Sequence, residues 1–122
     1  MDLRFPSGSA GLSSFLTDLG SHAGTAASGV LPATPERLEE LLRALWQGWV
    51  EFLIVEEGDV FVQVAGEGAG PYQLQYQPPG GGAMLQAAGG VIDGLTMCDV
   101  LRKVVAGDPG WHAGVAWEPF PG

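Results

Sequence analysis

The spacing of hydrophobic residues along the chain changes near residue 50. Before that point apolar residues recur three and four positions apart, which is the spacing of one face of a helix. After it they alternate with polar residues or form short continuous runs, which is typical of strands. The pattern therefore predicts a helical part followed by a sheet.

The segment that follows Thr34 has the strongest helical pattern. Thr34 can accept hydrogen bonds from the free N–H groups of a first turn, and Pro35 suits the first helical position. Gly48 is placed to end the helix. We therefore expect a helix from Pro35 to about Gly48. Its core-facing residues are Leu38, Leu41, Leu42, Leu45 and Trp49.

Residues 1–33 are rich in Ser, Gly, Ala and Thr and contain one periodic segment, which predicts a short amphipathic helix. The stretch from 21 to 33 has no period and is interpreted as a flexible linker. We therefore expect residues 1–33 to be a short helix and a linker, and residues 34–122 to form a single α+β domain. The apolar residues of the short helix are Leu12, Phe15, Leu16 and Leu19.

Strand-like segments follow one another from residue 50 onward: VEFLIVEE (50–57), VFVQVA (60–65), YQLQYQ (72–77) and AMLQAA (83–88). The connections between them are too short for crossover helices, so successive strands should pair antiparallel as a meander. We expect an α+β fold in which an antiparallel meander sheet of about four to five strands packs against two or three helices.

A last helix is predicted after the strands. Thr96 is expected to cap it, with Asp99 three residues later completing a capping box. Gly107 and Pro109 are expected to end it. The segment that begins at Trp111 is expected to form a last strand or an extended segment lying on the sheet.

Glutamines dominate one face of the predicted strand 72–77. Alternation along this strand places Gln73, Gln75 and Gln77 on the face opposite the aromatic residues. Uncharged amides of this kind can contact a partner. The alternative is a face that is simply solvated, as antiparallel sheets often have.

The charge balance narrows the classes of partner. With 14 acidic and 5 basic residues, the chain has a formal net charge of −9, which repels nucleic acid and anionic membranes and would attract basic proteins. The longest strongly apolar run is only of strand length, and no secretory signal is visible, so we expect a cytoplasmic protein without a membrane span.

Few residues are candidates for chemistry. Cys98 and His112 are the only candidates for a nucleophile and a base, and a lone cysteine in an apolar helix is more often a packing residue. We therefore expect no catalytic site, no cofactor and no metal. Three carboxylates gather near a predicted hairpin turn, at Glu56, Glu57 and Asp59, without the spacing of a calcium loop.

Trp46 is a candidate binding residue because it falls between the core-facing positions of its helix. A tryptophan in such a position can border a binding groove or a dimer contact. Packing in the core is the alternative role for the chain's tryptophans.

From Glu51 onward the chain resembles small actinobacterial proteins with a VQ-containing strand, an aromatic strand, a Gly-rich turn, a helix and a GD-x-x-W ending. The residues that carry the resemblance are FVQVA (61–65), YQLQY (72–76), and GDPGW (107–111) with the later AWEP. The order of elements is also similar to type III secretion chaperones and to proteins that accompany toxins in bacterial conflict loci. This resemblance implies a binding protein without enzymatic residues, often a homodimer. Family members carry an acidic residue and an arginine where this sequence has Gln75 and Gln77.

The sequence therefore supports two hypotheses about function. The first is a non-enzymatic protein-binding module, chaperone-like or immunity-like, that uses the glutamine face, the carboxylates at 56–59 or Trp46. The second is a small-molecule-binding domain or enzyme with a pocket between sheet and helices. An extended exposed face favours the first, and a deep polar cavity the second.

Overall fold

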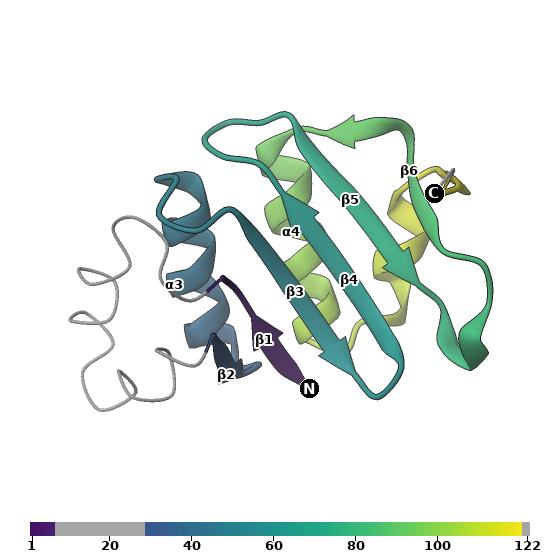
Figure 1. Ribbon diagram of the computed structural model, residues 1–122, viewed down its shortest axis with the longest axis horizontal. Coiled ribbons are helices and arrows are strands. Elements are labelled where there is room, and N and C mark those ends of the chain that lie inside the picture. The colour runs from purple at the N-terminus through teal and green to yellow at the C-terminus, as the bar shows by residue number, and fades with distance from the viewer. Residues whose placement is uncertain (7–28, 121–122) are drawn as a thin grey trace.

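The computed structural model describes residues 1–6 and 29–120. Within them, seven strands form one antiparallel open sheet in the order β2-β1-β3-β4-β5-β6-β7. The two α-helices lie behind the sheet in the view of Figure 1. The strands are β1 (Asp2–Arg4), β2 (Val30–Pro32), β3 (Phe52–Glu57), β4 (Val60–Ala65), β5 (Tyr72–Gln77), β6 (Leu85–Ile92) and β7 (Trp117–Pro119). The helices are α3 (Pro35–Trp46) and α4 (Gly94–Val105), with 3-10 turns η2 (Pro79–Gly81) and η3 (Pro109–Gly114).

The predicted α+β class and antiparallel meander are confirmed, because β3 to β6 pair in sequence order. The strand count is seven among the described residues, not four to five. β7 lies in the segment after Trp111 that was expected to form a last strand or an extended segment. The additional strands are β1 and β2, which are three residues long. Strands of that length are too short for alternation to be recognised in the sequence.

The expectation that residues 1–33 form only a short helix and a linker needs correcting, because residues 2–4 and 30–32 belong to the sheet. β1 inserts between β2 and β3, with Leu3 opposite Leu31 on one side and Val55 on the other. Leu3 and Leu31 are both fully buried. The amphipathic helix expected over residues 12–19 lies outside the described residues.

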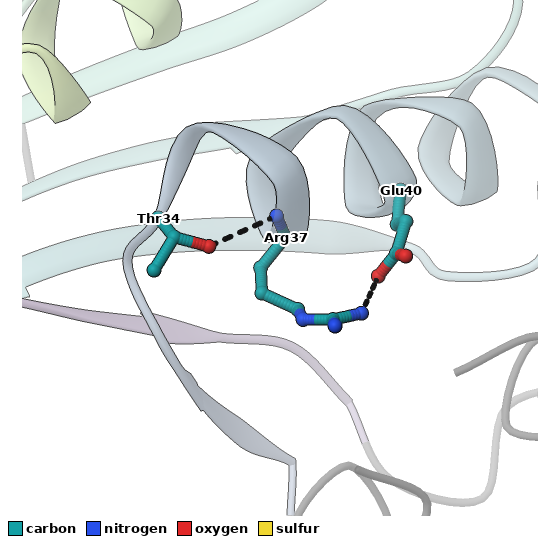
Figure 2. Close-up of polar contacts among 3 residues, drawn as sticks. All are labelled: Thr34, Arg37 and Glu40. Atoms are coloured by element: carbon teal, nitrogen blue, oxygen red, sulfur yellow. Dashed lines mark hydrogen bonds and ion pairs between the residues drawn. The ribbon is translucent and has the colours of Figure 1, made fainter. Parts of the chain in front are cut away.

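The predicted helix after Thr34 is confirmed as α3. The Thr34 hydroxyl oxygen accepts a hydrogen bond from the backbone N–H of Arg37 at 3.2 Å. Figure 2 shows this cap and the ion pair between Arg37 and Glu40 one turn further on. The helix ends at Trp46, and Gly48 follows with a φ of 76°, a backbone conformation that glycine adopts without strain.

The predicted cap of α4 is wrong. Asp93, not Thr96, precedes the helix, and its carboxylate accepts a hydrogen bond from the Thr96 backbone N–H at 2.9 Å. Hydrogen bonding from the Thr96 side chain, and after it from the Thr96 backbone N–H, lowers the pKa of Asp93. Asp99 instead pairs with Lys103 at 3.1 Å. The helix begins earlier than expected because β6 extends to Ile92 and leads directly into it.

The core lies between the helices and one face of the sheet. Alternate residues of the central strands point into it, and α3 and α4 contribute their apolar sides. The strand residues that are buried there are Leu53, Val55, Val62, Val64, Tyr72 and Leu74. The opposite face of the sheet, which we call the open face, has no described helix over it (Figure 1).

Raising the pH is expected to destabilise the fold through Tyr72. Burial raises the pKa of this phenol to about 12 from a usual 10.0, and Cys98 and Glu67 add to the shift. The fold therefore favours the neutral phenol. Its contribution to stability is complete below the unfolded-state pKa of about 10, and it is lost as the pH rises through the folded-state value of about 12.

The measurement is the urea unfolding midpoint at several pH values above 9 for the native sequence and for Tyr72→Phe. At neutral pH the variant should be less stable by about 1 kcal/mol, because the Tyr72 hydroxyl donates a hydrogen bond to the Gly68 carbonyl at 2.8 Å. Above pH 10 the difference should shrink. A parallel decline in the two proteins would show that Tyr72 does not carry the effect.

Candidate functional site

A row of polar side chains crosses the open face from one strand to the next. Strand register places Gln63 of β4 opposite Gln75 of β5, and Gln75 opposite Gln86 of β6. Residues paired in this way lie on the same face with their Cβ atoms about 5 Å apart. The row continues to Ile54 of β3 and Glu118 of β7. The amides of neighbouring strands therefore form one line across the sheet.

Most of these amides are free to bind another molecule. Gln86 donates a hydrogen bond from Nε2 to the Glu118 carboxylate at 2.8 Å, which fixes that end of the row. In the part of the chain that the structure describes, the side chains of Gln63, Gln73 and Gln75 make no hydrogen bond. Each free amide can both donate and accept, so it can match a backbone or a polar side chain.

Apolar side chains border the glutamine row on the same face. Phe52, Ile54 and Phe61 are half-buried, and Val91 opposite Gln73 is 47% exposed. Aromatic and aliphatic side chains give binding energy by losing contact with water, whereas the amides orient the partner. The open face thus combines both kinds of contact.

One end of the open face is hollowed. A depression of about 300 Å³ is lined by Gln73, Gln75, Gln86, Val91 and Phe120, together with Leu74 and Gly90. It lies beside the register shift in β6, where Gly89 and Gly90 both have positive φ angles. Such a bulge bends the strand and locally interrupts its pairing. The depression can receive a side chain of a partner.

The predicted glutamine set is only partly brought together. Gln73 and Gln75 lie at the depression, whereas the Gln77 amide donates hydrogen bonds to the carbonyls of Gly82 at 2.7 Å and Pro78 at 3.3 Å. Gln77 therefore holds the turn between β5 and β6. Gln63 and Gln86 join the row and were missed, because their place in it depends on strand register.

The three carboxylates near the hairpin turn, at Glu56, Glu57 and Asp59, lie in different surroundings. Glu56 lies on the open face and pairs with Arg4. Glu57 lines a cavity on the helix side of the sheet, and Asp59 is exposed in the hairpin turn. The three do not form one site. Among the described residues, no group of His, Cys, Asp and Glu could hold a metal ion.

Trp46, a candidate binding residue, lines a groove between α3 and α4. The groove has a volume of about 310 Å³ and is also lined by Leu95, Cys98 and Arg102. Trp46 is 36% and Leu95 75% exposed. Arg102 spans the two helices by donating two hydrogen bonds to the Glu39 carboxylate, at 2.9 and 2.8 Å. The groove therefore combines the apolar side chains of Trp46 and Leu95 with charged and polar ones, among them Glu39, Gln47 and Arg102.

Cys98 and His112 show no arrangement for catalysis. Burial raises the pKa of the Cys98 thiol, which disfavours the reactive thiolate. His112 lies in η3, stacked on Trp117 with a centroid distance of 5.2 Å and an interplanar angle of 12°. The two residues therefore lie in different environments: Cys98 is in α4, and His112 is in an aromatic cluster.

A cavity also lies where the second hypothesis expects a ligand pocket, between the sheet and the helix layer. It has a volume of about 290 Å³ and is largely lined by valines and aromatic residues.

In the described ranges, no helix is long and apolar enough to cross a membrane. Comparison of the chain with protein-family models, with curated proteins and with solved structures finds no match.

Proposed function

We propose that the chain is a non-enzymatic protein-binding module that holds a basic protein partner against the open face. The observation that supports this most is the row of free amides at Gln63, Gln75 and their neighbour Gln73, bordered by half-buried aromatic residues. We infer a chaperone-like or immunity-like role in the bacterial cytoplasm. The sequence resemblance to such proteins supports that role.

The composition of the open face distinguishes it from a merely solvated one. A solvated sheet face usually carries charged side chains next to the polar ones. Here the charged residues lie toward the two ends of the row: Arg4 is paired with Glu56, Asp2 lies opposite Glu56, and Glu118 accepts a hydrogen bond from Gln86. Protein interfaces are similarly poor in charge at their centre and rich in aromatic residues.

The charge of the molecule supports a basic partner. Arg4, Arg37, Arg102 and Lys103 are each in an ion pair with a carboxylate, and the chain has 14 acidic residues against 5 basic ones. The excess of acidic residues is therefore not compensated and gives the protein a negative field. Such a field speeds association with a basic protein, and added salt weakens it. It also repels nucleic acid.

The test is to replace an amide of the row by a cation. Gln75→Arg places a positive charge at the centre of the open face, which should repel a basic partner and lower its affinity at least about tenfold. Gln47→Arg is the matched control, because Gln47 is exposed beyond the end of α3 and lines the groove on the other side of the molecule.

The measurement is quantitative capture of partners from the source organism with tagged protein, followed by titration of the protein recovered. Both variants must keep the unfolding midpoint of the native sequence. Loss of one protein with Gln75→Arg and not with Gln47→Arg supports the proposal. Equal recovery with both variants, or recovery of nucleic acid, contradicts it.

A further inference from the structure

The cavity on the helix side of the sheet has walls from three parts of the chain. Val55 and Val62 form its floor from the sheet, Val104 contributes from the end of α4, and Tyr76 and Trp111 from β5 and η3. Its volume of about 290 Å³ is at the lower limit for a small-molecule pocket. It therefore suits a small ligand or a single long side chain.

Aromatic rings form a corner of this cavity. The rings of Tyr76 and Trp111 are 4.9 Å apart at 86°, and Trp111 lies at 88° to Trp117. Trp117 is itself held by a hydrogen bond from its Nε1 to the His112 carbonyl at 2.9 Å and by the stacked His112 ring. The contacts of Trp117 with Trp111 and His112 therefore hold the corner in place. The faces of such rings attract cations.

The side-chain charges around the cavity are negative, and Met1, which carries the N-terminal amino group, also lines it. Glu57 and Asp108 both line it, and in the described part of the chain neither is in an ion pair, including with the Met1 amino group. One Asp108 oxygen accepts a hydrogen bond from the Gly110 N–H at 2.8 Å. The C-terminal end of α4 adds a partial negative charge.

The nearest basic residues of α4 do not compensate these charges. Arg102 is bound to Glu39, and Lys103 to Asp99 one turn back along the helix. The cavity thus combines an apolar floor, an aromatic corner and two carboxylates that form no ion pair within the described residues. This combination matches the chemistry of a positive charge on an apolar stem.

We propose that the cavity binds an alkylguanidinium or alkylammonium group. The stem lies on Val55, Val62 and Val104, and the cation lies at the Tyr76–Trp111 corner within reach of Glu57 or Asp108. The group can belong to a free amine or guanidine, or to an arginine or lysine side chain of a protein. This site lies on the opposite side of the sheet from the open face and does not depend on the proposed function.

The experiment titrates the native protein with three probes and follows two-dimensional NMR shifts. The probes are butylguanidinium, its neutral isostere butylurea, and the peptide acetyl-Ala-Arg-Ala-amide. Butylguanidinium should bind at least about fivefold more tightly than butylurea, with shifts centred on Tyr76, Val104 and Trp111. Tighter binding of the peptide would assign the site to a protein side chain, and equal or weaker binding to a free cation.

Variants separate the cavity from the general acidity of the protein. Glu57→Gln and Trp111→Leu should each weaken butylguanidinium about fivefold. Asp59→Asn removes the same charge from the same hairpin but outside the cavity, so it should change the affinity by less than about twofold. Unfolding midpoints confirm that each variant is folded.

Equal binding of butylguanidinium and butylurea would overturn the proposal. The same holds for shifts centred elsewhere, for equal effects of Glu57→Gln and Asp59→Asn, or for no binding of either guanidinium probe. The titration needs no protein partner, and Gln75→Arg should leave it unchanged. Failure here is therefore distinguishable from failure of the proposed protein-binding function.

Discussion

Replacing Leu3 by alanine is expected to lower the free energy of unfolding by about 3 kcal/mol. Leu3 lies in a strand of three residues near the start of the chain, yet it is fully buried. It packs between Leu31 and Val55 in the register of the sheet. Truncation removes apolar contacts and leaves a cavity, and both effects destabilise the fold.

The measurement is urea unfolding followed by circular dichroism. Asp2→Ala is the matched control, because Asp2 is in the same strand but exposed, and it should change the stability by less than about 0.5 kcal/mol. A loss below about 1 kcal/mol for Leu3→Ala would show that β1 does not belong to the core. The stable unit would then begin near residue 34.

Gly94→Ala is expected to destabilise the fold by about 2 kcal/mol, although alanine normally favours a helix over glycine. A Cβ atom at Gly94 would lie 2.7 Å from Cζ3 of Trp46 and 3.0 Å from the Ala69 carbonyl oxygen. The Gly94 N–H donates to that same carbonyl at 2.8 Å. The start of α4 therefore cannot move away from the clash without losing this hydrogen bond.

A double-mutant cycle locates the origin of this loss. Trp46→Leu makes room, so Gly94→Ala should cost less in that background by about 1 kcal/mol. Gly82→Ala is the control, because nothing lies within 4 Å of a Cβ there and its φ is −64°. Additive effects of Gly94→Ala and Trp46→Leu, or stabilisation by Gly94→Ala, would contradict the close packing of α3 on α4.

Periodic patterns predicted the central elements because each of them buries several residues at regular spacing. α3 and the strands β3 to β5 follow the pattern closely. β1 and β2 each bury one central residue, Leu3 and Leu31. A single apolar residue has no period. β1 pairs with β3, which is distant in sequence, as the partners Leu3 and Val55 show, and β2 pairs with β1.

The start of α4 was predicted about three residues too late because of two glycines in the preceding strand. The sequence around Gly89 and Gly90 resembles a turn, but both residues form a bulge inside β6. The strand therefore continues to Ile92, and Asp93 becomes the cap. A pair of glycines can form either a turn or a bulge inside a strand. The pairing of that strand with its neighbours decides which of the two forms.

Part of the candidate site was predictable from one strand alone. Alternation along β5 places Gln73 and Gln75 on the face opposite Leu74, and the structure places them there. Alternation cannot show which residue of the next strand lies beside each of them, because that depends on register. Gln63 and Gln86 were therefore missed. The aromatic corner at Trp111 also depends on where η3 packs against β5.

Site-specific photo-crosslinking from the open face tests the central claim most directly. A benzophenone side chain is introduced at Gln63, in the glutamine row on β4, and at Ala106, which is exposed beyond the end of α4. Both proteins are irradiated in cells of the source organism, and the adducts are identified by mass spectrometry. We predict a discrete adduct with a basic protein from position 63 and none from position 106. An adduct from position 106 alone, or none from position 63, would contradict a protein-binding role for the open face.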